Sequence, residues 1–185
     1  MRETPTDEAL VQAVRRGDAA AFDALYRRWS ARLFGYLVRA TGERATAEDL
    51  LQESFMAVLE DRGFDLRPGG FPAFLFTVAR RRALNRARAD GRHDRRVEAL
   101  RGAAATDAAP ASPEATLTQR ELVLTGLAAL PEAHRDALVL KEVAGLTYRE
   151  IALVQDVPEG TAKSRLHHAI HSLRALLRPG EENAP

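Results

Sequence analysis

Apolar side chains recur at steps of three and four residues along most of this 185-residue chain, and no segment alternates convincingly between apolar and polar positions. Such spacing is typical of helices that bury one face. We therefore expect an all-α fold. The helices fall into two groups, separated by a segment with almost no large apolar side chain, which predicts two small four-helix domains joined by a flexible linker.

The first group is bounded by residues that start and stop helices. Thr6 can cap the first helix, "GD" at 17 and 18 can break it, and Thr46 followed by Asp49 resembles a capping box for the third. Residues 62–70, "RGFDLRPGG", are expected to form a loop because proline and paired glycine stop both helix and strand. The four predicted helices run from Thr6 to about Arg16, from after Asp18 to about Gly42, from Thr46 to about Glu60 and from Phe71 to about Asp90.

The second group follows residues 92–116, whose small side chains and prolines predict a linker without a core of its own. The predicted domains are therefore residues 1–91 and 117–178, with a disordered tail at 179–185. Helices of the second domain are expected at Leu117–Leu130, Pro131–Val143, Thr147–Gln155 and Pro158–Leu177.

The third predicted helix, "TAEDLLQESFMAVLE", concentrates carboxylates. On a helical wheel its core face holds Ala47, Leu51, Ser54, Phe55 and Val58. Its opposite face holds Asp49, Gln52, Glu53, Met56 and Glu60. That face suits a basic protein partner, because methionine is common on protein-binding surfaces and carboxylates discourage contact with DNA. A plain solvated face accounts for the same pattern.

Positive charge gathers farther along the chain, although the net charge is only +1. Residues 67–101 hold ten arginines against three carboxylates, which is the footprint of a polyanion-binding segment. The second half of the fourth predicted helix offers Arg80, Arg81, Arg82, Arg86 and Arg88 together with Asn85. Guanidinium groups pair with phosphates and asparagine can read a base edge, so we expect a DNA face here. Alternatively, Arg82 and its neighbours neutralise acidic residues such as Asp61 or Asp65.

The last two predicted helices are joined by the short turn "QDVPEG" and resemble a helix-turn-helix, here Tyr148 to His167. Thr147 and Glu150 predict a capping box for the first of them. The second has an apolar face and, opposite it, a small, polar and basic face suited to phosphates and base edges. An ordinary amphipathic surface helix is the alternative. His167 and His171 have the spacing of metal ligands, but no third ligand is evident nearby, so we predict no metal site.

Other features limit the range of functions. The chain has no cysteine, no apolar run long enough to span a bilayer and no signal-peptide pattern at its N-terminus, so we expect a cytoplasmic protein without membrane insertion. The histidines are scattered or lie on the reading helix, and no nucleophile and base are visibly arranged together. We therefore expect neither an enzyme nor a cofactor.

Three motifs together resemble the bacterial RNA polymerase sigma factors of the extracytoplasmic-function (ECF) type. They are "AEDLLQESF", "FPAFLFTVARRRAL" and "GLTYREIALVQDVPEGTAKSRL", and they occur in the family's order and spacing. The resemblance covers about residues 7–91 and 115–177. It implies a sigma region 2 domain, a sigma region 4 domain, and a promoter-specificity factor whose partners are core RNA polymerase, promoter DNA and an anti-sigma factor.

The resemblance also implies roles for individual positions. Asp49, Leu50, Gln52 and Glu53, with Met56 beside them, match the segment that docks on the polymerase. Arg80, Arg81, Asn85 and Arg88 match the helix that binds the minus-ten element. The reader of the minus-thirty-five element is matched by Glu159, Thr161, Lys163, Ser164, Arg165, His167 and His168.

Two expectations depend on how such a factor opens DNA. If melting is driven by capture of unstacked bases, Phe64 and Asp65 in the loop are candidates for that pocket. They are equally suited to packing and helix capping. A helix-turn-helix regulator that acts without the polymerase is the competing interpretation, but it leaves the acidic face and the whole first domain without a role.

Overall fold

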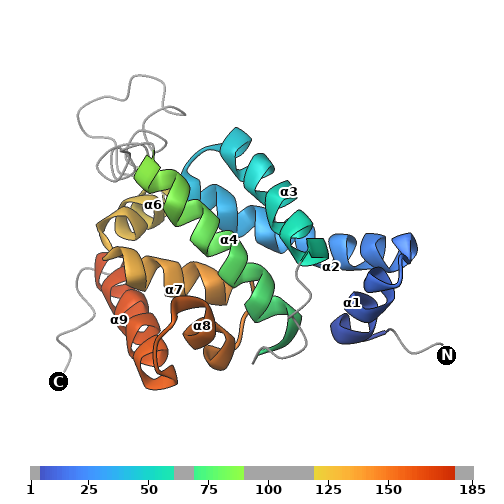
Figure 1. The fold of residues 1–185 in the computed structure, drawn as a ribbon. Helices are drawn as coiled ribbons and strands as arrows, with labels where there is room; N and C mark the ends of the chain where they lie inside the picture. Colours follow the sequence, from blue (N-terminus) through green and yellow to red (C-terminus); the bar gives the residue numbers. More distant parts are fainter. Residues whose placement is uncertain (1–4, 61–68, 90–118, 178–185) are drawn as a thin grey trace.

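The computed structural model describes residues 5–60, 69–89 and 119–177. Every regular element in these ranges is helical, which confirms the all-α prediction. The helices are α1 (Asp7–Arg15), α2 (Ala19–Thr41), α3 (Arg44–Glu60), α4 (Gly70–Ala89), α6 (Gln119–Ala129), α7 (Glu132–Glu142), α8 (Tyr148–Gln155) and α9 (Glu159–Leu177) (Figure 1). We call α1 to α4 the N-terminal unit and α6 to α9 the C-terminal unit. The predicted linker and tail lie outside the described residues.

Local signals position most helix ends. The hydroxyl of Thr6 accepts a hydrogen bond from the backbone N–H of Ala9 and caps α1 as predicted. The Asp18 carboxylate accepts from two backbone N–H groups at the start of α2. Gly42 ends α2 with φ of 74°, a left-handed conformation that glycine adopts without steric cost.

The predicted start of α3 is wrong. The helix begins at Arg44, and the backbone N–H of Ala47 already donates to the carbonyl of Glu43. Thr46 is buried inside the first turn, where its hydroxyl donates to the Glu43 carboxylate at 2.6 Å. Because Thr46 points back toward Glu43, it cannot form the expected capping box with Asp49.

An aromatic cluster forms the centre of the N-terminal unit. The ring centroids of Trp29 and Phe76 lie 6.3 Å apart, and those of Tyr36 and Phe76 lie 5.6 Å apart, both pairs in edge-to-face geometry. Such pairs contribute roughly 0.5 to 1.5 kcal/mol each beyond the burial of their area. Trp29 also donates its indole N–H to Asp7, which fixes α1 against α2.

The C-terminal unit contains the predicted helix-turn-helix. Thr147 and Glu150 form the expected capping box at the start of α8. Asp156 ends α8 with a left-handed φ of 54°, and α9 begins three residues later. A small apolar cluster of Leu130, Leu138, Leu166 and Ala169 holds α9 against α7.

The two units pack against each other and share the larger of the two apolar clusters. One cluster of buried side chains runs from Leu33 and Phe76 in the N-terminal unit to Leu140 and Ile151 in the C-terminal unit. Helix α4 lies between α3 and the pair α7 and α8 (Figure 1), with α8 against α4 and α7 against α2. The sequence predicted two units joined by a flexible linker but not how they are placed relative to each other, and the structure shows them in a closed arrangement.

The capping box gives a first testable prediction. Thr147→Ala removes the side-chain acceptor for the Glu150 N–H and should lower the free energy of unfolding by about 1 kcal/mol, measured by urea denaturation. Ser164→Ala, at an exposed position inside α9, is the control and should change it by less than about 0.5 kcal/mol. Equal effects of the two substitutions would show that the cap does not stabilise α8.

Candidate DNA-binding and protein-binding surfaces

The outer face of α3 is exposed as the helical wheel predicts. Asp49, Gln52 and Glu53 are accessible, and 53% of Met56 is exposed. Nearby apolar exposure comes from Leu59 at the end of α3 and Tyr26 on α2, which contacts Phe55. An acidic face with accessible apolar side chains is the arrangement expected of a protein-binding surface.

Leu50 is buried, with only 3% of its surface accessible. It lies among the core side chains, so it can support the α3 face from within but cannot contact a partner in this arrangement. The wheel had not included Leu50 in the core face, and its place in the docking set came from the family motif alone. Burial therefore separates it from its exposed neighbours Asp49 and Gln52.

Glu53 also contributes to the packing of α3 against α4. Its carboxylate accepts a hydrogen bond from Arg82 at 2.8 Å, with both side chains partly exposed. The sequence suggested Asp61 or Asp65 as neutralising partners of Arg82, and both lie outside the described residues. Arg82 is thus directed toward α3 and away from the predicted DNA face.

The predicted DNA face of α4 is divided by the C-terminal unit. Arg81, Asn85 and Arg88 are exposed and line one edge of a groove. The other edge is formed by Leu153 and Val154 of α8 and by Asp156, which follows it. Arg80 is half-buried at the base of this groove. The other two minus-ten candidates, Phe64 and Asp65, lie outside the described residues.

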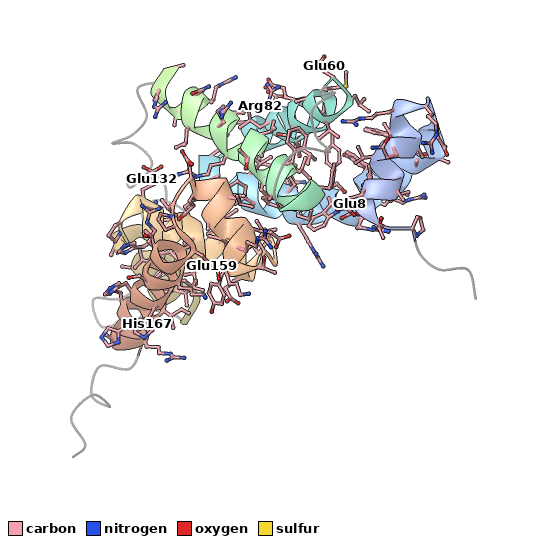
Figure 2. The ribbon with its side chains drawn as sticks, turned by 60° about the horizontal axis from the view of Figure 1, so that its bottom comes forward. Glu8, Glu60, Arg82, Glu132, Glu159 and His167 are labelled. Carbon is pink, nitrogen blue, oxygen red and sulfur yellow. The ribbon has the colours of Figure 1, made fainter. Side chains whose placement is uncertain are left out.

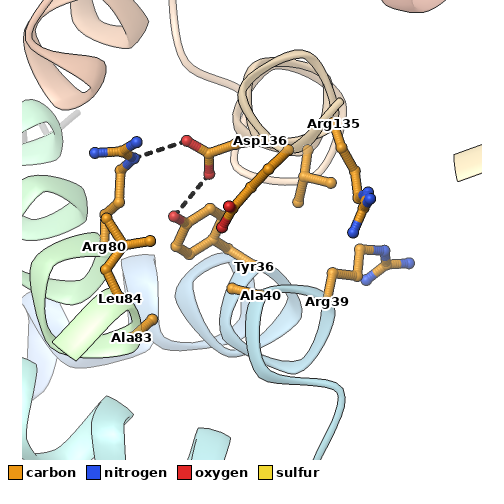
Figure 3. A pocket seen from close by; sticks show the side chains of 10 residues that line it. Tyr36, Arg39, Ala40, Arg80, Ala83, Leu84, Arg135 and Asp136 are labelled. Carbon is orange, nitrogen blue, oxygen red and sulfur yellow. Dashed lines mark hydrogen bonds and ion pairs between the residues drawn. The ribbon is translucent and has the colours of Figure 1, made fainter. Parts of the chain in front are cut away.

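Arg80 forms an ion pair that sequence reasoning missed. Its Nε donates to the carboxylate of Asp136 on α7 at 2.7 Å, and the Tyr36 hydroxyl donates to the same carboxylate at 2.9 Å (Figure 3). Burial alone would lower the pKa of Arg80, but the charge and hydrogen bond of Asp136 outweigh it and raise the pKa above the ordinary value. Arg80 is therefore a permanent cation held by a carboxylate.

The α9 helix presents the expected face. Ala162, Leu166 and Ala169 are buried. Glu159, Lys163, Ser164, His167 and His168 are exposed, while Thr161 and Arg165 are half-buried. Glu159 and His167 are labelled on this helix in Figure 2. The structure thus brings the whole predicted minus-thirty-five set together near the start of one helix.

Two of the basic side chains on this face are already paired. Lys163 donates to Glu159 at 2.8 Å, and this pair raises the pKa of the exposed Lys163. Arg165 donates to the amide oxygen of Gln155 at 2.9 Å. Gln155 of α8 is buried and donates in turn to Asp136, so its amide oxygen is a fixed acceptor that orients the Arg165 side chain.

Histidine rings gather beside the reading face. His134 of α7 stacks on His168 with ring centroids 5.9 Å apart, and His167 stacks on His171 at 6.5 Å. Desolvation by burial, followed by the nearby His168 and Arg165, lowers the pKa of His134. Within the described ranges, no group of three or more metal-ligating side chains converges.

Comparison with known proteins decides the family. The Sigma-70 region 2 family model matches residues 25–93, and the Sigma-70 region 4 model matches residues 120–173. RNA polymerase sigma factor CarQ of Myxococcus xanthus is 36% identical over 90% of this chain and 95% of its own length. The ECF RNA polymerase sigma-E factor of Haemophilus influenzae is 31% identical over 97% of this chain and 99% of its own length. The chain belongs to the ECF family of RNA polymerase sigma factors.

The solved structures show the same fold for this sigma factor. A similar chain is the sigma factor RpoE of Bartonella quintana, crystallised in complex with the anti-sigma factor NepR. The two chains align with a TM-score of 0.60 at 23% identity, over 84% of this chain and 96% of that one.

Among the described helices, none is both long and apolar enough to cross a membrane.

The histidine contacts generate a prediction about pH. His134 should titrate below the ordinary pKa of about 6.5, and His168→Asn should raise its pKa by removing a neighbouring positive charge. Because the folded chain binds this proton less readily than the unfolded chain, the contribution of His134 to stability is present above the unfolded pKa. It is lost as the pH falls toward the folded pKa.

The measurement is an NMR titration of the imidazole Cε1–H signals. His171→Asn is the matched control: it removes a histidine of the same helix that is not among the causes of the lowered His134 pKa, and it should leave the His134 midpoint in place. A His134 midpoint at or above 6.5 in the unsubstituted protein would contradict the assignment of desolvation as the main cause.

Proposed function

We propose that this sigma factor is the promoter-specificity subunit of RNA polymerase, which binds the core enzyme and directs initiation at a specific set of promoters. The observation that carries the proposal is the combination, in one chain, of the region 2 and region 4 matches with an exposed acidic face on α3 and an exposed reading face on α9. Such a subunit binds protein and DNA and performs no catalysis of its own.

We assign residues 1–91 to the region 2 domain and residues 117–178 to the region 4 domain, with residues 92–116 as the linker. The exposed part of the docking set on α3, Asp49, Gln52, Glu53 and Met56, contacts core polymerase. Its negative charge suits a basic partner and keeps promoter DNA away from this side. Leu50 supports this face from the core.

The minus-ten element is bound by the end of α4. Arg80, Arg81 and Arg88 offer guanidinium groups to phosphates, and Asn85 can read a base edge. Phe64 and Asp65, which precede α4 in the sequence and lie outside the described residues, trap unstacked bases of the non-template strand. The support for α4 is its groove, which gathers all four of these helical side chains on one side.

The minus-thirty-five element is read by α9 in the major groove. Lys163 and Arg165 bind phosphates, while Ser164, His167 and His168 lie where base edges are reached. Glu159 and Thr161 complete the contact at the helix start. A regulator that acts without polymerase is not favoured, because it explains only this unit and the full-length relatives are named as sigma factors.

An anti-sigma factor is a further partner. RpoE, which has the same fold, was solved in complex with the anti-sigma factor NepR, and this supports a similar inhibitor for the present chain. The sigma factor then acts in the cytoplasm, where its polymerase and DNA are found.

The docking face is tested by run-off transcription with core polymerase on genomic promoter fragments. Combined Asp49→Ala, Gln52→Ala and Glu53→Ala should reduce specific transcripts by roughly tenfold or more, because truncating charged groups that pair across an interface costs about 2 kcal/mol or more of binding free energy. Unaltered transcription by the triple variant would contradict the assignment of α3.

Two controls isolate the docking effect. Arg82→Ala breaks only the Glu53–Arg82 ion pair and shows how much of any loss comes from packing of α3 on α4. Glu142→Ala removes an exposed carboxylate from α7 and should leave transcription unchanged. The absence of transcripts from every fragment with the unsubstituted protein would favour the plain regulator.

The reading helix is tested by measuring duplex binding at several salt concentrations. Lys163→Ala and Arg165→Ala should each weaken binding and reduce the slope of log affinity against log salt by about 1, because each removes one phosphate contact. Arg174→Ala, in the last turn of α9, is the matched control and should keep the slope. Slopes that stay the same in all three variants would show that α9 does not bind phosphates.

A further inference from the structure

Asp136 is the meeting point of the two units. Its carboxylate accepts hydrogen bonds from Arg80 of α4 at 2.7 Å, Tyr36 of α2 at 2.9 Å and Gln155 of α8 at 3.0 Å. Two of these donors belong to the N-terminal unit, and one lies 100 positions away in the sequence. Figure 3 shows the carboxylate between the Arg80 guanidinium and the Tyr36 hydroxyl.

The Asp136 carboxylate occupies the position that a phosphate would take on Arg80. Carboxylates and phosphates bind guanidinium groups through the same charge-assisted hydrogen bonds. Only 25% of the Arg80 side chain and 14% of the Asp136 side chain are exposed. A phosphate in the groove must compete with this carboxylate, which takes the Nε–H of Arg80 and neutralises its charge.

The surrounding contacts close the same face. Leu153 and Val154 of α8, with Asp156 directly after it, form the far wall of the groove that holds Arg81, Asn85 and Arg88. A side chain at Gly69, just before α4, would overlap Leu153. The C-terminal unit therefore narrows the predicted path of the minus-ten strand along α4 to this groove, although Arg81, Asn85 and Arg88 remain exposed in it.

The same network reaches the reading helix. Gln155 donates to Asp136 and accepts from Arg165, so one chain of hydrogen bonds links an arginine of the minus-ten face to an arginine of the minus-thirty-five face. Separation of the units breaks the contact of Asp136 with Arg80 and leaves its contact with Gln155 within the C-terminal unit. The switchable link is therefore the one between the two units.

We propose that Asp136 holds the free sigma factor in an autoinhibited closed state, in which Asp136 engages Arg80 and the C-terminal unit walls the minus-ten groove of α4 until the two units separate. The proposal rests on the assignment of α4 to DNA made above. Because the occupant of the face is a carboxylate of the same chain, the device needs no inhibitor protein. Any partner that binds the separated units better shifts the population toward the open state.

The absence of cysteine makes the closed state directly measurable. Glu48→Cys and Ser172→Cys, exposed on α3 and α9, allow two dyes to be attached for single-molecule energy transfer. Asp136→Asn in this background keeps the side-chain volume and removes the charge. It should reduce the ratio of closed to open molecules about tenfold, the typical effect of losing a charged hydrogen-bond partner.

Glu142→Gln neutralises an exposed carboxylate on the same helix and is the matched control. It should leave the energy-transfer distribution in place. If Asp136→Asn gives the same distribution as the unsubstituted chain, the latch is overturned. This readout involves neither DNA nor polymerase, so it judges the latch separately from the proposed function.

A reversible lock tests inhibition without removing Asp136. The Cβ of a side chain at Gly35 would lie 3.0 Å from Cγ1 of Val143, close enough for Gly35→Cys and Val143→Cys to form a disulfide between α2 and the end of α7. The oxidised variant should bind a fluorescein-labelled single-stranded DNA of mixed sequence at least about fivefold more weakly than the reduced variant. Reductant should restore both DNA binding and run-off transcription.

Single Gly35→Cys is the control, because it cannot form the crosslink and should respond to neither oxidant nor reductant. Failure of the disulfide to form in the folded double variant would contradict the closed arrangement. Equal DNA binding by the oxidised and reduced forms would overturn the inhibition. If the reduced form binds DNA more tightly but gives no transcripts, the latch stands and the proposed function fails.

Discussion

The ion pair between Asp136 and Arg80 is the contact on which the arrangement of this sigma factor depends. It joins α7 to α4, and with Tyr36 and Gln155 it fixes the corner at which the two units meet. The half-buried carboxylate has three donors, so its desolvation is largely compensated. The position of α8 over the α4 groove follows from this corner, and so does the orientation of Arg165 on the reading helix.

A charged contact at an interface between units has different consequences from an apolar one. Apolar packing around Leu140 and Ile151 favours contact between the two units over a broad area, but it is non-directional and does not by itself fix their relative orientation. The Asp136 network favours one relative orientation of the two units, because its three donors must converge on two carboxylate oxygens. Once water can replace these donors and a phosphate can replace the carboxylate as the acceptor for Arg80, the network loses much of its advantage. An interface built in this way can be specific and still reversible, which suits a protein that must expose the same arginines to DNA.

Much of the local structure follows from the sequence. Thr6, Gly42 and the Thr147 capping box mark helix ends as predicted, and the faces of α3 and α9 divide into buried and exposed residues as their wheels indicate. The predicted start of α3 was wrong because the Thr46 hydroxyl donates to Glu43, three residues before it, and does not cap the helix. Prediction of the site has the same limit. The family motif placed Leu50 in the docking set without showing that it is buried, and the charge of Arg82 did not show that its partner is Glu53.

The sequence by itself determined the helices, their faces and the grouping of basic and acidic side chains, because these depend on residues within a few turns of one another. It also carried the motifs of the family. Only the tertiary structure decided that Arg80 faces Asp136 and that α8 covers α4. Contacts of this kind join residues far apart in the chain, and no local periodicity records them. A single aspartate in the middle of α7 looks like any solvated carboxylate until the fold places three donors around it.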